Sequence, residues 1–241
     1  MAEHRTDLPG RGPDAADGDS AARELDAIAT ALAHDLRAPL RAIDGFSRIL
    51  LADHAGTLPE ATERYLALVR DAGTELADLL DGLVDIVRMS QVPLDLGPRS
   101  PGVLAAELVE AVLAPRAVGR DVTWVIGDVP GCRADQALLR RLLEELLDNA
   151  LKFTSGQASA RIELGWDVDA GAYFVRDDGI GVDGELPEQA FAIFGRLQSR
   201  EAFAGTGAGL AIAARIAARH GGRVWGRGTP GGGLTVWFTI A

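Results

Sequence analysis

The sequence predicts an α+β protein in which an antiparallel helical hairpin precedes a separate domain of mixed helices and strands. Two features predict this fold. Over residues 25–86, apolar side chains recur at steps of three and four, which is typical of amphipathic helices. After residue 93, short β-like runs alternate with helical ones. The 241 residues, of which 47% are hydrophobic, are enough to bury one or two ordinary cores.

Residues 1–20 are rich in Gly, Pro, Asp and Ala and hold almost no large apolar side chain. Ordering such a segment costs conformational entropy that no burial offsets, so we predict a flexible tail over residues 1–20. The segment also lacks the apolar run of a signal peptide. No other stretch is long and apolar enough to span a membrane. We therefore expect a cytoplasmic protein without a membrane span.

The helical hairpin is predicted over residues 21–92. Its two apolar stripes are separated by the connector 54–62, in which Gly56 and Pro59 favour a turn. Two helices bury only one seam, and a second copy of the chain would cover the apolar surface that remains. We therefore expect a homodimer whose hairpins form a four-helix bundle. The stripes consist of Leu25, Ile28, Leu32, Leu36, Pro39, Ile43, Phe46 and Leu50, then Leu66, Val69, Ala72, Leu76, Leu79, Leu83 and Ile86.

Residues 93–241 are predicted to form the second domain, an α/β or α+β fold of ordinary size. The β-like runs are Val122 to Ile126, Ala160 to Trp166, Ala172 to Val175, Arg223 to Trp225 and Leu234 to Ile240. The helical runs are Val103 to Val112, Gln136 to Lys152 and Leu210 to His220.

The net charge of −11, from 24 Lys and Arg against 35 Asp and Glu, argues against a general nucleic-acid or anionic-membrane binder. Such proteins need a basic surface. Cys132 is the one cysteine in the sequence, which excludes an intrachain disulfide and a cysteine-cluster metal site. The histidines at positions 4, 54 and 220 show no metal-ligand spacing.

His34 is the first residue that can carry chemistry. It falls between the apolar positions Leu32 and Leu36, so we predict that it faces solvent. An exposed imidazole beside the Asp35 carboxylate can act as a nucleophile with Asp35 as its base; the alternative is an ordinary solvated pair. Pro39 frees the carbonyl of Asp35 from its helical hydrogen bond, so we expect the helix to bend or loosen beside His34.

Glu145, Asn149 and Lys152 form a second candidate set. Their spacing of four and three places them on one face of a predicted helix. A carboxylate or amide oxygen there can bind Mg²⁺ while the lysine meets phosphate oxygens. The alternative is a solvated polar face.

Two glycine-containing segments follow, at 176–181 after a predicted strand and at 205–210 opening a predicted helix. Glycines allow a backbone to approach a ligand closely, and the amides at a helix N-terminus favour phosphate. The second segment partly matches the dinucleotide fingerprint. It lacks a surrounding βαβ unit and an acid about 20 residues on, so we do not favour a dinucleotide site.

Taken together and in this order, the segments resemble the transmitter core of a two-component sensor histidine kinase, especially of the phytochrome-like branch. The resemblance covers about residues 25–241. It implies a dimerisation and phosphoacceptor hairpin followed by an α/β-sandwich ATP-binding domain of the gyrase and histidine kinase type. Residues 34–40 resemble the H box, 145–152 the N box, 177–181 the G1 box, 191–197 the F box and 205–210 the G2 box, and residues 219–225 are also similar to the family.

The resemblance implies an ATP-dependent protein histidine kinase. His34 would accept the γ-phosphoryl group of ATP while Asp35 takes its proton, and the group would pass to an aspartate of a response regulator receiver domain. Asn149 and Glu145 would coordinate Mg²⁺, and Lys152 would contact phosphate.

The resemblance also implies how the nucleotide is held. Asp177 would accept the adenine amino group, and Gly179 and Gly181 would shape that part of the site. Residues 182–205 would form a lid. The G2 box would act as the hinge of the lid and would bring its backbone amides to the phosphates. Its residues are Gly205, Thr206, Gly207, Gly209 and Leu210.

Two positions depart from the family pattern. Glu145 stands where the N box commonly begins with Asn, and its spacing to Asn149 resembles the related gyrase and chaperone ATPases, in which the acid activates water. Ala38 stands where many members carry a Thr or Asn used to dephosphorylate the regulator, which leaves phosphatase activity open. The alternatives to a kinase are a scaffold that binds ATP and a regulator without turnover, and a Glu145-dependent ATPase. Nothing before residue 20 resembles a sensor, so we expect the signal from a separate upstream protein or from a longer chain of which this is a part.

Overall fold

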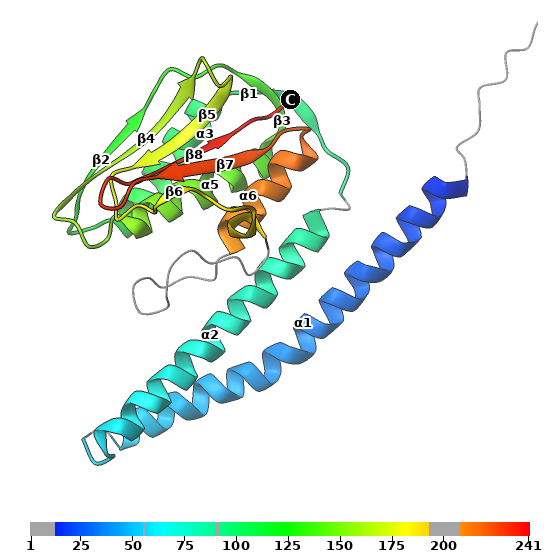
Figure 1. Cartoon of the computed structure of the whole chain (residues 1–241). Coiled ribbons are helices and arrows are strands. Elements are labelled where there is room, and N and C mark those ends of the chain that lie inside the picture. The colour runs from blue at the N-terminus through cyan, green and yellow to red at the C-terminus, as the bar shows by residue number, and fades with distance from the viewer. Residues whose placement is uncertain (1–12, 55, 90–91, 193–207) are drawn as a thin grey trace, which may run out of the picture.

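Two long helices open the computed structural model, which describes residues 13–54, 56–89, 92–192 and 208–241. Helix α1 (Pro13–Asp53) and helix α2 (Glu60–Met89) run antiparallel and form the predicted hairpin (Figure 1). Helix α1 begins inside the segment predicted as a tail, of which residues 1–12 lie outside the described part. Proline has a fixed φ that suits the first turn of a helix, which fits Pro13 as the first residue of α1.

The seam of the hairpin differs from the predicted stripe. Among the described side chains of α1, the buried ones are Ala33, Leu40 and Ser47, which are spaced by seven residues and so share one face. Leu36 and Phe46 of the predicted stripe are 43% and 68% exposed. The contact with α2 therefore uses widely spaced side chains, of which Ala33 and Ser47 are small. Most of the described large apolar side chains of α1 remain exposed in the single chain.

The second part of the chain contains a six-stranded sheet with the order β2-β4-β5-β8-β7-β6. Strands β2 and β4 pair in parallel, and the other neighbours pair antiparallel. A separate antiparallel pair joins β1 to β3. The strands are β1 (Leu96–Arg99), β2 (Asp121–Ile126), β3 (Cys132–Asp135), β4 (Ser159–Asp167), β5 (Ala172–Asp177), β6 (Gly184–Glu185), β7 (Val224–Gly228) and β8 (Leu234–Phe238).

Helices cover one face of the six-stranded sheet, as Figure 1 shows for α3, α5 and α6. Their leucines, isoleucines and alanines interlock with inward side chains of the strands in one buried core that includes Leu147, Ile162, Ile216 and Phe238. The predicted α+β class, with a helical region before a mixed sheet, is confirmed. The helical elements are α3 (Pro101–Leu108), a π-helical turn η1 (Val109–Leu113), α4 (Ala114–Arg116), α5 (Gln136–Phe153), a 3₁₀ turn η2 (Glu188–Phe191) and α6 (Ala208–Arg219).

The C-terminal part of α2 packs against the sheet domain next to α6 (Figure 1). Gly82 allows this approach, because a Cβ atom there would lie 2.7 Å from the Cβ of Ala208. Ile86 is buried in the core of the sheet domain. Arg219 of α6 donates hydrogen bonds to the carbonyls of Met89 and Val92. The end of the hairpin is therefore packed on the domain that follows it.

Candidate active site

Helix α5 carries the first part of the site, and both of its ends are fixed. Oδ1 of Asp135 accepts the amides two and three residues on, at 3.0 and 3.1 Å, which caps the N-terminus. Arg120 donates to the carbonyls of Leu151, at 3.0 Å, and Thr154, at 2.7 Å, at the other end. The inward face of the helix is buried through Leu139, Leu142, Leu143, Leu146, Leu147, Ala150 and Leu151.

Glu145, Asn149 and Lys152 lie on the partly exposed side of α5. The Glu145 side chain is 18% exposed, and burial raises the pKa of its carboxyl, although the nearby Arg141 guanidinium opposes this shift. The Lys152 ammonium lies 4.8 Å from the centre of the Phe153 ring. Amide and carboxylate oxygens with a nearby ammonium are groups that suit a magnesium ion and phosphates.

Asp177 ends strand β5 and is buried. Its Oδ1 accepts the amides of Gly179, at 2.9 Å, and Leu234, at 3.3 Å. Removal from water outweighs these bonds and raises the pKa of the Asp177 carboxyl to about 6. Within the described residues both hydrogen bonds reach Oδ1, so Oδ2 can accept a donor from a ligand.

The segment that follows β5 meets the end of α5. The amide of Ile180 donates to the carbonyl of Phe153 at 3.3 Å. Gly181 has φ +65°, and a Cβ atom there would lie 2.0 Å from a backbone oxygen of the β7–β8 connection, so the position requires glycine. The structure therefore joins the predicted segments on α5 and after β5 in one place.

Gly209 and Leu210 lie in the first turn of α6. A Cβ atom on Gly209 would lie 2.7 Å from Oε2 of Glu145 and 3.1 Å from Nδ2 of Asn149, so the start of α6 touches both side chains. The remaining predicted residues of this segment lie outside the described part of the chain: Gly205, Thr206 and Gly207. Residues 193–197 of the predicted F box also lie outside it.

His34 and Asp35 lie on α1, away from these three segments in the chain. Their side chains are 83% and 82% exposed, as the sequence predicts for His34, and Nδ1 of His34 lies 3.3 Å from Oδ1 of Asp35. Helix α1 continues without a break through Pro39. An exposed imidazole with one nitrogen held by a carboxylate is a suitable nucleophile.

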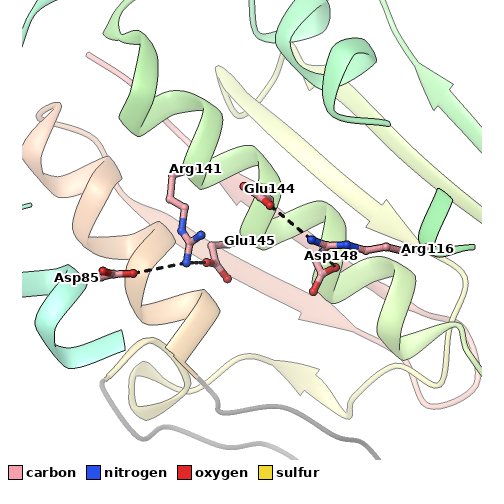
Figure 2. Close-up of polar contacts among 6 residues, drawn as sticks. All are labelled: Asp85, Arg116, Arg141, Glu144, Glu145 and Asp148. Carbon is pink, nitrogen blue, oxygen red and sulfur yellow. Dashed lines mark hydrogen bonds and ion pairs between the residues drawn. The ribbon is translucent and has the colours of Figure 1, made fainter. Parts of the chain in front are cut away.

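Arginines that sequence reasoning missed bind the acids of α5 (Figure 2). Arg141 binds Glu145 at 2.7 Å, and Arg116 binds Asp148 at 2.9 Å. Arg141 stands four residues before Glu145, so the helical spacing was an available signal for this pair. Arg116 comes from α4, and no local pattern relates it to Asp148.

Two further searches concern metal ions and membranes. Among the described residues, no cluster of three or more His, Cys, Asp or Glu side chains is arranged to hold a metal ion. None of the helices in the described ranges is long and apolar enough to cross a bilayer.

Two family models match the chain. Residues 24–91, which include His34, match the His Kinase A (phospho-acceptor) domain. Residues 134–241, which include the α5, β5 and α6 segments, match the histidine kinase-, DNA gyrase B- and HSP90-like ATPase.

Individual proteins are similar over most of the chain. Cyanobacterial phytochrome B of Nostoc sp. (strain PCC 7120) is 33% identical over 226 residues, which are 90% of this chain and 29% of that protein. The methanogenesis regulatory histidine kinase FilI of Methanothrix harundinacea is 31% identical over 90% of this chain and 24% of its own length. The chain thus spans less than a third of these relatives. The crystal structure of full-length ShkA in complex with AMPPNP covers 88% of this chain and 46% of its own chain, with a TM-score of 0.56 and 28% identity.

Proposed function

Because this chain belongs to the sensor histidine kinase family, we propose that it uses ATP to phosphorylate His34 and then passes the phosphoryl group to an aspartate of a response regulator. In the first step the bond from the γ-phosphorus to the bridging oxygen breaks, a phosphorus–nitrogen bond forms on the imidazole, and ADP leaves. The observation that carries the proposal is that one chain holds both an exposed histidine–carboxylate pair and the converging residues of α5, β5 and α6.

The contact between His34 and Asp35 supports their assignment as nucleophile and base. In the tautomer that donates from Nδ1 to Asp35, Nε2 carries the free lone pair and attacks the phosphorus. The Nδ1 proton then moves to Asp35 as the positive charge develops on the ring. The high exposure of the imidazole lets the nucleotide site and the regulator reach the same nitrogen in turn.

Asp177 would accept the adenine amino group through Oδ2. Its Oδ1 is held by two backbone amides, which fixes the direction of the carboxylate before the nucleotide binds. Gly179 supplies one of these amides, and Gly181 allows the tight backbone path beside it. The similar solved structure contains AMPPNP, an ATP analogue, which supports the proposal that this chain binds a nucleotide.

Asn149 and Glu145 would hold Mg²⁺. They fit the ion, because Mg²⁺ takes one or two protein oxygens together with phosphate oxygens and water. A bound magnesium ion would neutralise phosphate charge, and Lys152 would contact the phosphates. The contact of Gly209 with both side chains places the start of α6 beside them. The lid over residues 182–205, with Gly205, Thr206 and Gly207, remains part of the proposal.

We further infer a homodimer in the cytoplasm, with residues 21–92 as the dimerisation and phosphotransfer hairpin and residues 93–241 as the catalytic domain. The exposed apolar side chains of the hairpin support the dimer, because they form a face that a second hairpin would cover. This face includes Leu32, Leu36, Ile43, Phe46, Ile49, Leu68, Val69 and Leu76.

The test is incubation of the full chain with γ-labelled ATP and Mg²⁺, followed by acid and alkali treatment of the labelled protein. Wild type is compared with His34→Gln, Asn149→Ala and the matched control His54→Gln, which changes a histidine of the hairpin connector. We expect acid-labile, alkali-stable label in wild type and His54→Gln, and none in the other two. Acid-labile label that persists in His34→Gln contradicts the proposal.

The same experiment separates the alternatives. Nucleotide binding without label or phosphate release would support a scaffold. Steady phosphate release that Glu145→Ala abolishes and His34→Gln leaves unchanged would support an ATPase.

A further inference from the structure

One guanidinium lies between an acid of the hairpin and an acid of the candidate active site. The same nitrogen of Arg141 on α5 lies 2.7 Å from Oε1 of Glu145 and 3.7 Å from Oδ2 of Asp85 on α2. Figure 2 shows the three side chains in a row, with Arg141 in the middle. The end of the hairpin and the N box are thus connected through a single cation.

The pair with Arg141 determines how Glu145 is directed. Arg141 engages Oε1, whereas Oε2 faces the start of α6, where a Cβ atom on Gly209 would lie 2.7 Å from it. The amide of Asn149 is at the same place. The neighbouring acids Glu144 and Asp148 bind Arg116 instead. Oε2 of Glu145 and the Asn149 amide therefore lie together against the start of α6.

Asp85 is held where it can reach Arg141. Gly82, three residues before it, is in close contact with Ala208, and Ile86, next to it, is buried in the core of the sheet domain. One turn earlier on α2, Asp81 binds Arg37, which stands three residues after His34 on α1. Helix α2 thus contacts both parts of the chain through successive acids: Asp81 binds Arg37 of α1, and Asp85 pairs with Arg141 of α5.

We propose that Arg141 is a positioning residue that orients Glu145 for Mg²⁺·ATP, and that Asp85 holds Arg141 in that place, so that docking of α2 tightens the metal-dependent part of nucleotide binding. The inference rests on the proposed role of Glu145 as a magnesium ligand. Without Arg141 the carboxylate loses the partner that fixes one of its oxygens, and the other oxygen is no longer held beside the Asn149 amide at the start of α6. Loss of Asp85 has a smaller effect, because the pair is longer and about half exposed.

The test is calorimetric titration of the full chain with ATP, once with Mg²⁺ and once with a chelator. The measured quantity is the dissociation constant of ATP with the chelator divided by that with Mg²⁺. This ratio reports how much Mg²⁺ strengthens ATP binding. We expect Arg141→Gln to reduce this ratio at least about tenfold, as the loss of a partner that orients a metal ligand does. Asp85→Asn should reduce it by about threefold. Arg141→Lys should restore part of the ratio, because one nitrogen makes both contacts.

Matched controls are Arg140→Gln and Asp81→Asn. Arg140 is adjacent on α5 but lies 3.9 Å from Glu107, and Asp81 binds Arg37 within the hairpin. Both should keep the wild-type ratio. In a double-mutant cycle, Asp85→Asn should have no further effect once Arg141 is Gln, because its action passes through that side chain.

The outcomes separate this inference from the proposed function. Wild type that fails to bind ATP contradicts the proposed function itself. If Glu145→Gln keeps the wild-type ratio, Glu145 is not a magnesium ligand, and this inference fails with that role. If Glu145→Gln removes the effect of Mg²⁺ on ATP binding but Arg141→Gln leaves it unchanged, the inference alone is overturned. It is also overturned if Asp85→Asn has the same effect in wild type as in Arg141→Gln.

Discussion

Asp177 and Asp178 are adjacent acids in different surroundings. Asp177 is buried, and its carboxylate accepts two amides of its own part of the sheet. Asp178 accepts the amide of Arg161 at 2.9 Å and so fastens the loop to strand β4. Burial raises the pKa of Asp177 to about 6, which means that the charged form is held at a cost in stability. Such a cost is typical of a group kept for binding.

Asp177→Asn should therefore stabilise the empty protein at pH 7 and weaken nucleotide binding. Removal of the buried charge is worth up to about 3 kcal/mol, since the pKa differs from the ordinary value by about two units. The amide also presents a donor to the adenine amino group, so ATP affinity should fall at least about tenfold. Thermal unfolding and calorimetric titration measure the two effects. Asp178→Asn is the control, and equal losses of ATP affinity in both variants would contradict the assignment.

The titration of Asp177 gives two opposite pH dependences. The folded-state pKa of about 6 lies above the ordinary value of 3.8, so this group's stabilising contribution is present below pH 3.8 and is lost as pH rises through 6. In its proposed role toward the adenine amino group, Asp177 binds ATP through the ionised carboxylate. Between pH 7 and pH 5 the ionised fraction falls by about tenfold, and the apparent ATP affinity should fall with it. Titration of the ATP phosphates affects all variants alike, so the measured quantity is the difference from Asp177→Asn; identical pH profiles would contradict the prediction.

The hairpin shows what element-scale patterns predict and what they miss. Steps of three and four predicted both helices, and Gly56 and Pro59 predicted the turn between them. The same pattern did not distinguish the seam inside one chain from the face that stays exposed, because both follow helical periods. Two of the three described buried seam residues of α1, Ala33 and Ser47, are small, and their low hydrophobicity hides them from such a reading.

The sheet domain gives the same lesson. All five predicted β-like runs overlap observed strands, because most of them are rich in β-branched and aromatic residues. The missed strands β1, β3 and β6 have two to four residues and contain Gly, Pro or charged residues, so pairing with a neighbour defines them. In the site, helical spacing placed Glu145 and Asn149 on one side of α5. The contribution of Arg116, which comes from another helix, required the structure.

The exposed face of α1 predicts how the hairpin associates. Phe46 is 68% exposed near the turn end of the hairpin, and Phe46→Glu would place a charge in the expected bundle interface. The dimer dissociation constant should rise at least about thirtyfold, as for loss of an aromatic interface anchor. Light scattering after size exclusion at several concentrations measures this constant. Val118→Glu changes an apolar residue that is 84% exposed in the sheet domain and should leave it unchanged. An unaltered dimer in Phe46→Glu would place the interface elsewhere.

At the scale of the whole molecule, the proposed function requires two parts of the chain to act on one phosphoryl group. The proposed donor site lies at α5, β5 and α6, and the proposed acceptor lies on α1; α2 packs against both α1 and α6 (Figure 1). The contacts that hold the end of α2 therefore set how far the two parts can move. Gly82 and Ile86 contribute packing, Asp85 contributes an ion pair, and Arg219 donates one hydrogen bond to the last carbonyl of the helix, that of Met89, and one to the carbonyl of Val92 beyond it.

Arg219→Ala tests whether those hydrogen bonds hold the end of α2. The carbonyls of Met89 and Val92 lose a charged donor, and the last turn of a helix has few other partners for its carbonyls. Amide hydrogen exchange over residues 82–89 should accelerate by about tenfold or more, because local opening of the helix end becomes easier. Exchange in the buried middle of α5 should stay at its wild-type rate. Arg223→Ala is the matched control, since it removes an arginine whose guanidinium lies 4.6 Å from the centre of the Trp225 ring on strand β7. If both variants exchange like wild type, packing at Gly82 and Ile86 alone holds the helix end, and the hydrogen bonds of Arg219 contribute little to the docked arrangement.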